Sequence, residues 1–204
     1  MIKKHIFIEM KYDLPDNQKE ILPNLLDLKS VEEIGLSEFE GFLKAEILFT
    51  EKLTPSTKFT AAYILELHKT ALGHLYTFAG KLRDVNMSKG GFTFPAARFI
   101  GNSMAEFDRG ILSNLPDIYE NKEDLIRDIA VVHGELLFIH PFREGNGRTA
   151  RILANLMSRK QGFGGLEFGR IKQNEFPKYI LAVQHCALQD YSKMIDMIRS
   201  IFPG

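Results

Sequence analysis

The sequence predicts an all-α fold, a helical bundle that carries one small β-hairpin. Three observations support this prediction. Apolar residues recur at helical spacing through most of the chain, whereas a convincing strand pattern occurs once, between residues 84 and 95. Prolines and glycines separate the helical segments, so the chain is expected to turn back on itself repeatedly. With 204 residues, the chain is long enough for one domain with a sizeable core.

The N-terminal part, residues 1–56, is expected to form a helical extension that packs on the remaining core, residues 57–204. Residues 1–30 look peripheral because two prolines interrupt any long helix there. Residues 37–52 show apolar positions near helical spacing, and a break around Pro55 follows.

A second helix is expected over residues 57–73. Residues 84–95 then combine two short extended runs around Gly90 and Gly91, which is typical of a β-hairpin. An irregular loop is the alternative for this stretch. The helical pattern resumes over residues 96–112.

The strongest helical pattern covers residues 124–139. Its apolar positions step by four, three, four and three and so form one stripe: Leu125, Ile129, Val132, Leu136 and Ile139. Pro141 ends this helix because it cannot donate a backbone hydrogen bond. A further helix is expected to begin after Gly147. Two more are expected over residues 173–188 and 191–202.

Composition excludes some classes of protein. Lys and Arg together number 26, as do Asp and Glu, and this zero net charge argues against broad binding to nucleic acid or to a membrane surface. No apolar run is long enough for a transmembrane helix, and the first residues lack a signal-peptide core. The one cysteine, Cys186, cannot form an intramolecular disulfide. We therefore expect a cytoplasmic protein.

The segment His140–Arg151, with the sequence HPFREGNGRTAR, lies between two apolar helices and concentrates polar chemistry. Its glycines let the backbone adopt positive φ, so that successive N–H groups can surround an anion at the start of the next helix. Arg148 and Arg151 are three residues apart and can share one side of that helix. The guanidinium group of each arginine can donate two parallel hydrogen bonds, a geometry that suits phosphate oxygens.

Two further groups of this segment suit nucleotide chemistry. A carboxylate beside phosphates, here Glu144, is compatible when Mg²⁺ bridges the two. The ordinary pKa of about 6.5 suits His140 as a general base. Taken singly, these residues have ordinary structural roles, such as a helix cap or a surface charge. Together at this spacing, they indicate a polyphosphate-handling site.

The segment resembles the signature of the Fic family, H-x-F-x-(D/E)-G-N-G-R-x-x-R, and fills every specified position. A second stretch, residues 75–92, resembles the family's Y-x-W-A-G-x-x-R segment and the hairpin that follows it, called the flap. Phe78 stands where tryptophan is common. The resemblance covers about residues 57–202, more loosely near Tyr179, and implies a Fic-type helical bundle.

The resemblance implies a protein adenylyltransferase, a nucleotidyltransferase that moves AMP from ATP onto a Ser, Thr or Tyr hydroxyl of a target protein. His140 would be the general base, Phe142 the buried anchor of the loop, and Glu144 the Mg²⁺ ligand. The implied nucleotide-binding residues are Gly145, Asn146, Gly147, Arg148, Thr149, Arg151 and Tyr179. The implied target-binding flap comprises Lys89, Gly90, Gly91, Phe92, Thr93 and Phe94. Among these, the resemblance places Arg148 at the β-phosphate and Arg151 at the γ-phosphate.

Two positions of the signature bear on the reaction. Family members that phosphorylate their targets carry Lys at the position of Gly147, and members that transfer phosphocholine carry Ala at the position of Gly145. The glycines found here therefore favour AMP transfer.

Many family members are restrained by a helix with an (S/T)-x-x-x-E-(G/N) motif. This chain offers only mismatched candidates, at Glu40-Gly41, Glu120-Asn121 and Ser192–Met197. We therefore expect a separate small antitoxin protein that supplies the inhibitory helix, which would make the chain a toxin held in check. Regulation by another route is the alternative.

Two competing interpretations remain. The chain could be a binding module with the Fic fold that is catalytically silent or differently specific, although the intact signature argues against lost activity. It could also be a metal hydrolase that uses His133 and His140, seven residues apart on one helix face. A third metal ligand is lacking for that second interpretation.

Overall fold

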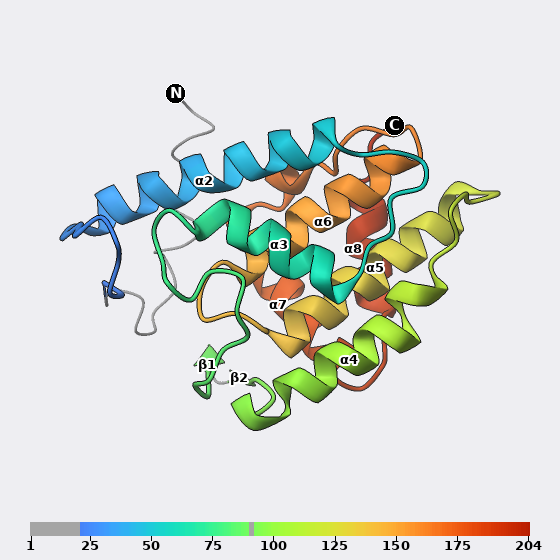
Figure 1. The fold of residues 1–204 in the computed structure, drawn as a ribbon. Coiled ribbons are helices and arrows are strands. Elements are labelled where there is room, and N and C mark those ends of the chain that lie inside the picture. The colour runs from blue at the N-terminus through green and yellow to red at the C-terminus, as the bar shows by residue number, and fades with distance from the viewer. Residues whose placement is uncertain (1–20, 90–91) are drawn as a thin grey trace.

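A computed structural model describes residues 21–89 and 92–204 of the chain (Figure 1). This part of the chain contains seven α-helices, four short 3₁₀ helices and one two-stranded antiparallel sheet. The predicted all-α bundle with one small hairpin is therefore confirmed. Helix α5 (Lys122–Ile139) contacts α4, α6, α7 and α8, which makes it the centre of the bundle.

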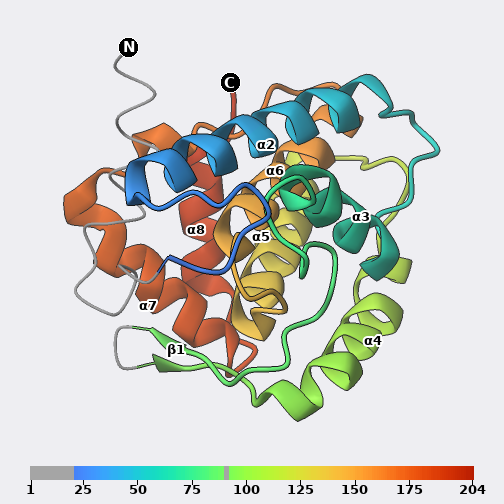
Figure 2. The ribbon, with the colours of Figure 1, turned by 60° about the vertical axis from the view of Figure 1, so that its left-hand side comes forward.

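Helix α2 (Val31–Glu51) lies along one side of the bundle and packs on α3 and α6 (Figures 1 and 2). It begins six residues before the predicted start, because Ser30 and Glu33 form a capping box that satisfies the first backbone N–H groups. Apart from Gly35 and Gly41, its buried residues follow one stripe, Ile34, Glu38, Phe42, Ala45 and Phe49. The boundary predicted near residue 56 stays a prediction.

Helix α3 (Ala61–Leu72) begins after Thr60, whose side chain accepts a hydrogen bond from the backbone N–H of Tyr63. The predicted hairpin follows, with β1 (Ser88–Lys89) paired to β2 (Phe92–Thr93). Its turn, Gly90-Gly91, lies outside the described residues.

The hairpin lies at the end of the molecule away from α2 (Figure 2). The helical segment that follows it is divided into η1 (Ala97–Phe99), α4 (Ile100–Gly110) and η2 (Leu112–Asn114). The sequence pattern had predicted one helix over this stretch.

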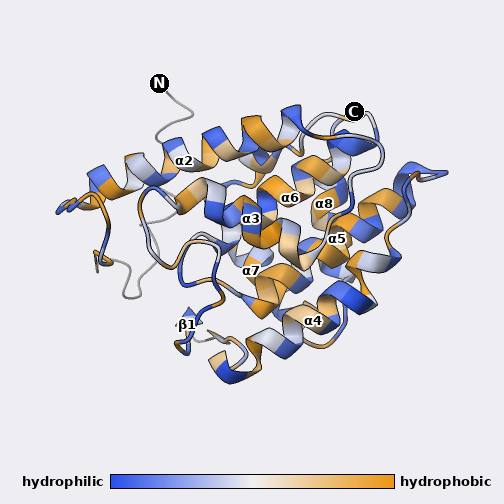
Figure 3. Cartoon of the chain, in the orientation of Figure 1, coloured by the Kyte–Doolittle hydropathy of each residue, from blue (hydrophilic) through white to orange (hydrophobic). Residues whose placement is uncertain are grey.

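Helices α5 and α6 (Asn146–Lys160) pack against each other and are joined by the segment 140–145. Asn121 caps α5 by accepting a hydrogen bond from the backbone N–H of Asp124. Apolar residues of both helices belong to the buried core of the bundle, and Figure 3 shows where apolar residues occur along the chain.

The C-terminal part packs on α5. It consists of η3 (Phe168–Arg170), η4 (Gln173–Glu175), α7 (Phe176–Cys186) and α8 (Ser192–Ile201). None of the described helices is long and apolar enough to cross a lipid bilayer.

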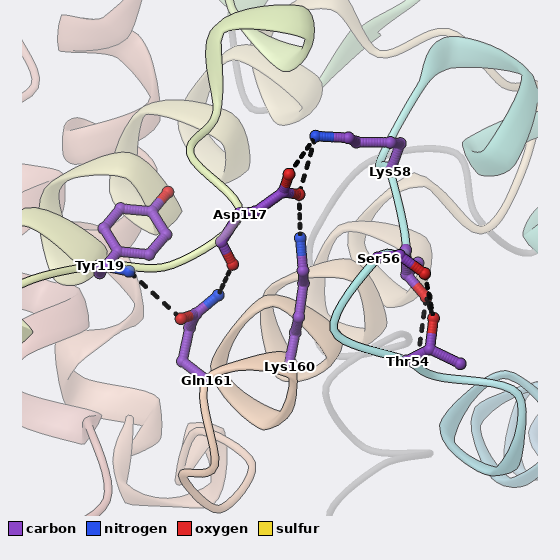
Figure 4. Close-up of polar contacts among 8 residues, drawn as sticks. Thr54, Ser56, Lys58, Asp117, Tyr119, Lys160 and Gln161 are labelled. Atoms are coloured by element: carbon purple, nitrogen blue, oxygen red, sulfur yellow. Dashed lines mark hydrogen bonds and ion pairs between the residues drawn. The ribbon is translucent and has the colours of Figure 1, made fainter.

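A polar cluster holds the C-terminal end of α6 (Figure 4). The carboxylate of Asp117 accepts hydrogen bonds from Lys58, at 2.7 Å, and from Lys160, at 3.1 Å. The side-chain amide of Gln161 donates to the backbone carbonyl of Asp117 at 2.9 Å, and its oxygen accepts from the backbone N–H of Tyr119. These contacts fix the end of α6 that lies opposite the polar loop.

Candidate active site

His140 is the first residue after α5 and adopts a left-handed conformation with φ of 51°. This conformation is uncommon for a residue with a side chain, and here it turns the chain out of the helix just before Pro141. The imidazole is half-buried and stacks on the ring of Phe94, with 3.9 Å between the ring centroids. Phe94, at the end of the hairpin predicted as the flap, therefore contacts the predicted general base directly.

The hydrogen bonds of His140 determine which ring nitrogen carries the proton. Nδ1 lies 3.2 Å from the carbonyl oxygen of Leu137, which can only accept, so Nδ1 is the protonated nitrogen. Nε2 then keeps its lone pair. Burial lowers the pKa of His140 to about 4, so the ring is neutral near pH 7. A neutral imidazole with a fixed tautomer is suited to accept a proton through Nε2.

Asn146 closes the loop that follows His140. Its side-chain oxygen accepts a hydrogen bond from the N–H of Phe142 at 2.8 Å, and its amide donates to the carbonyl of the same residue at 2.7 Å. The side chain of Asn146 is thus used to hold the loop. Any contact of Asn146 with an anion would come from its backbone N–H.

Phe142 is fully buried, in the position expected of a loop anchor. Its ring stacks on His68 of α3, with centroids 3.8 Å apart. The Nδ1 atom of His68 accepts a hydrogen bond from the N–H of Gly80, so its Nε2–H donates to the carbonyl of Glu144 at 2.9 Å. Burial lowers the pKa of His68 to about 4, which keeps this connection neutral. The loop is therefore fixed to α3 at two residues.

Gly145 forms the N-terminal boundary of α6, with φ of 80°. A Cβ atom there would lie 2.8 Å from Cζ of Phe42 and 3.1 Å from Cδ1 of Leu72, so both conformation and packing require glycine. Gly147 differs, because a Cβ atom there would meet nothing within 4 Å. The first turn of α6 is therefore open on the side of Gly147, at the positive end of the helix dipole.

The carboxylate of Glu144 lies at this helix terminus. Its Oε1 accepts hydrogen bonds from the N–H of Gly145 at 2.8 Å and from Arg148 at 3.0 Å. Among the residues that the structure describes, no group of three or more histidine, cysteine or acidic side chains could hold a metal ion by itself. One carboxylate at the N-terminus of a helix is the kind of ligand that Mg²⁺ takes when a protein and phosphates hold the ion jointly.

Arg148 is held by a second acid, Glu38 of α2, which is completely buried. Nη2 of Arg148 donates to Glu38 at 2.9 Å, and its guanidinium lies 4.6 Å from the centroid of the Phe42 ring. The hydroxyl of Tyr76 donates to the other oxygen of Glu38 at 2.7 Å. A buried acid with these two partners fixes the direction of Arg148 toward the loop.

Arg151 lies one turn further along α6 and forms no ion pair with any described residue. Its guanidinium lies 5.5 Å from the centroid of the Phe168 ring, and its Nε atom is buried without a hydrogen-bond partner within the described part of the chain. Tyr179 is buried near it, and the charge of Arg151 opposes the rise in the pKa of Tyr179 that burial causes.

Two buried hydrogen bonds connect α5, α6 and α7 near Arg151. The Nδ1–H of His133 donates to the carbonyl of Ala150 at 3.2 Å, so its Nε2 accepts from the hydroxyl of Tyr179 at 2.6 Å. Burial lowers the pKa of His133 to about 3. The hydroxyl of Tyr179 is thus directed at His133, and the expected nucleotide contact of Tyr179 stays a prediction. His133 is buried in the core of the bundle, and its two ring nitrogens are used by Ala150 and Tyr179.

Comparison with protein families adds an independent observation. Residues 58–158, which include the hairpin and the whole loop between α5 and α6, match the model of the Fic/DOC family. The chain belongs to the Fic/DOC family. This Fic domain carries the family signature on the loop whose geometry is described above.

Curated relatives of this Fic domain are named as protein adenylyltransferases. The protein adenylyltransferase Fic of Nematostella vectensis is 26% identical over 178 residues, which are 87% of this chain and 40% of the relative. The protein adenylyltransferase fic-1 of Caenorhabditis briggsae is 33% identical over 133 residues, 65% of this chain and 25% of the relative. The chain therefore spans a quarter to two fifths of the length of these relatives.

Solved structures of Fic domains share the fold of this chain. The N-terminal Fic domain of a putative cell filamentation protein from Bartonella quintana matches with a TM-score of 0.74 at 20% identity, over 96% of this chain and 94% of that one. The BepC protein of Bartonella tribocorum, solved with bound AMPPNP, matches with a TM-score of 0.73 at 19% identity, over 96% of this chain and 99% of that one. The architecture of the bundle is therefore that of a Fic domain.

The structure brings most of the predicted site residues of this Fic domain together. The loop after α5 and the first turn of α6 carry His140, Glu144, Arg148 and the glycines of the signature. Phe94 of the hairpin lies against His140. Thr149 is completely buried, and its hydroxyl has no partner within the described part of the chain, so it faces the core. A nucleotide contact of Thr149 stays a prediction.

Glu38 is a site residue that no sequence motif indicates, whereas Arg83 fills the last position of the Y-x-W-A-G-x-x-R segment without an expected role. Glu38 occupies a core position in the apolar stripe of α2, between Ile34 and Phe42. An acid in such a stripe is a signal that the sequence contains, because buried acids require a partner. Arg83 is 4% exposed and donates to the carbonyl of His140. No local pattern indicates those long-range acceptors.

Proposed function

We propose that this Fic domain is a protein adenylyltransferase that transfers AMP from ATP to a Ser, Thr or Tyr hydroxyl of a target protein. The observation that carries the proposal is the neutral imidazole of His140, whose Nδ1–H is held by Leu137 and whose Nε2 keeps its lone pair. This base lies between the hairpin and the loop that leads to the N-terminus of α6. The names of the curated relatives support the same reaction.

In the proposed reaction, Nε2 of His140 removes the proton of the target hydroxyl. The hydroxyl oxygen then attacks the α-phosphorus of ATP, the bond to the bridging oxygen breaks, and pyrophosphate leaves. The backbone N–H groups at residues 145–147, with Arg148 and Arg151, would stabilise the charge on the phosphates. Glu144 would hold Mg²⁺, which when bound neutralises phosphate charge and orients the oxygens.

Nucleotide binding would replace contacts that the residues make with one another. The carboxylate of Glu144 accepts from the N–H of Gly145 and from Arg148, the same donors that the phosphates would use. A bound triphosphate with Mg²⁺ would take over these donors, while Glu144 would turn to the metal ion. Glu38 would keep Arg148 directed at the loop throughout.

The hairpin would bind the target. Residues 88–89 and 92–93 form a short two-stranded edge close to His140, and an extended target segment could add to it as a further strand. Such an addition would bring a hydroxyl side chain of the target to the imidazole. The turn residues Gly90 and Gly91 of this proposed flap lie outside the described part.

We expect restraint by a separate antitoxin protein, because the sequence lacks the inhibitory motif and Arg151 forms no ion pair within residues 21–89 and 92–204. An inhibitory carboxylate from a partner would meet that guanidinium. Under this proposal the chain acts in the cytoplasm as a toxin-like enzyme.

The experiment compares ATP labelled on the α-phosphate with ATP labelled on the γ-phosphate, each incubated with Mg²⁺, the protein and a cell lysate. Relative to the lysate without the protein, we expect added α-label on protein and no added γ-label, because pyrophosphate leaves. His140→Ala should abolish the labelling, whereas His74→Ala, a histidine that bonds to Ser37, should not. Incorporated γ-label would indicate phosphoryl transfer instead. Nucleotide binding without pyrophosphate release would favour the binding-module alternative.

A further inference from the structure

Arg83 connects the hairpin to the catalytic loop. It lies between α3 and β1 and is 4% exposed. Its backbone N–H donates to the carbonyl of Pro141 at 2.8 Å, and its Nε donates to the carbonyl of His140 at 2.7 Å. Its two terminal nitrogens donate to the carbonyls of Val85 and Pro95, each at 2.6 Å. All four acceptors are backbone oxygens.

The four acceptors lie at three functionally distinct places. Val85 precedes the first strand of the hairpin, and Pro95 follows the second strand. His140 and Pro141 begin the loop between α5 and α6. One guanidinium therefore fixes both ends of the hairpin relative to the backbone of His140.

The bond to His140 acts on a strained residue. A left-handed conformation costs a residue with a side chain about 1–2 kcal/mol, so contacts around His140 must hold it. Nε of Arg83 binds its carbonyl, and the N–H of Arg83 binds the next carbonyl, which fixes the peptide plane that follows His140. The direction of the imidazole depends on this plane.

We propose that Arg83 is a positioning residue that sets the register between a target strand on the hairpin and Nε2 of His140. The proposal rests on the proposed transferase function, which makes the hairpin the target-binding element. Only arginine offers a planar fork with Nε and both terminal nitrogens as donors in fixed geometry. Lysine has one nitrogen, so it cannot hold the carbonyls of Val85, Pro95 and His140 in the same arrangement.

The geometry separates this role from nucleotide binding. The hydrogen bonds of Arg83 reach no residue of the segment 144–151, which carries the predicted phosphate contacts. Loss of the fork should therefore change the position of the hairpin and of His140, and leave the α6 terminus as it is. Target modification should fall while ATP affinity stays near its normal value.

The test uses Arg83→Lys and Arg83→Gln, with Arg98→Gln as the matched control. Arg98 is exposed and lies over the ring of Phe99, 4.7 Å from its centroid. For Arg83→Lys we expect ATP affinity within about twofold of the unmodified protein and a fall in AMP transfer on the order of 100-fold, which a displacement of about 1 Å is able to cause. The control should retain both activities.

A second readout does not depend on catalysis. NMR titration of His140 should show its pKa moving from about 4 toward the ordinary value in Arg83→Lys, because the stacked Phe94 ring is released. Amide hydrogen exchange in residues 85–95 should rise in the same variant. These measurements remain valid if the protein transfers no AMP, so the two proposals can fail separately.

Three outcomes would overturn the role of Arg83, two of which concern the Arg83→Lys variant directly. One is an Arg83→Lys variant with unchanged target modification. The other is a variant in which hydrogen exchange of the hairpin and the titration of His140 match those of the Arg98→Gln control. Loss of ATP affinity in step with loss of transfer would also contradict it, because it would indicate a general structural effect.

Discussion

Gly145 and Gly147 stand two residues apart in the same loop, yet the structure predicts opposite effects of alanine at the two positions. At Gly145, alanine must adopt φ of 80°, which costs about 1–2 kcal/mol. Its Cβ would lie 2.8 Å from Phe42 and 3.1 Å from Leu72, and overpacking of this kind costs about 1–3 kcal/mol. Together these effects should lower the free energy of unfolding by roughly 2–5 kcal/mol.

At Gly147, alanine meets nothing within 4 Å and lies inside the first turn of α6. Alanine is favoured over glycine in helices by up to about 1 kcal/mol, so Gly147→Ala should be at least as stable as the unmodified protein. The added methyl group would occupy the side from which phosphates approach the helix terminus. We therefore expect ATP affinity to fall about tenfold, which is about 1.4 kcal/mol.

Thermal unfolding with and without ATP and Mg²⁺ measures both effects. For a chain of this size, 1 kcal/mol shifts Tm by about 2–4 °C, so Gly145→Ala should lose roughly 4–20 °C. Gly147→Ala should keep its Tm without nucleotide and lose most of the stabilisation that ATP gives the unmodified protein. If Gly147→Ala binds ATP normally, the phosphate site at this helix terminus is wrong. If Gly145→Ala is as stable as the unmodified protein, the packing argument fails.

Two further predictions concern buried side chains that can ionise. Glu38→Gln should lower the free energy of unfolding by about 1–3 kcal/mol in urea titrations, because the buried partner of Arg148 loses its charge. Glu40→Gln, on the exposed face of the same helix, is the control, and equal effects of the two would remove the special role of Glu38. Stability should also fall with acidification. Burial holds the pKa of His68 near 4 and of His133 near 3, so below about pH 6.5 the unfolded chain binds protons that the folded chain does not. We expect a loss of several kcal/mol between pH 6.5 and 4, and a flat profile over this interval would contradict neutral buried histidines.

The positions of most helices could be predicted from the sequence because their apolar stripes are regular. The predicted helix at residues 124–139 differs from α5 only at its start, where Asn121 provides the cap. The start of α2 was predicted six residues late, although Ser30 and Glu33 form a recognisable capping box. The helix predicted at residues 96–112 is divided in the structure, because periodicity alone does not distinguish 3₁₀ from α-helical turns.

The site was less completely predictable. The loop residues lie next to one another in sequence, so their proximity followed from the motif. Glu38 and Arg83 reach this loop from elements 110 and 57 residues away in sequence, measured to Arg148 and His140. Such contacts depend on how the helices pack. The side chain of Asn146 is a related case, since only the structure shows that it is used within the loop.

The contact between Asn146 and Phe142 has a consequence for the chemical durability of the protein. One side-chain amide serves as both donor and acceptor to a single residue, as a neighbouring strand would. Conversion of this amide to a carboxylate, with nearly the same shape, would place an acceptor against the carbonyl of Phe142 and remove the donor. The loop would then open without any change in size or in the surrounding core. Hydrolysis of the Asn146 side-chain amide alone would therefore disrupt the loop in a protein whose remaining structure is intact.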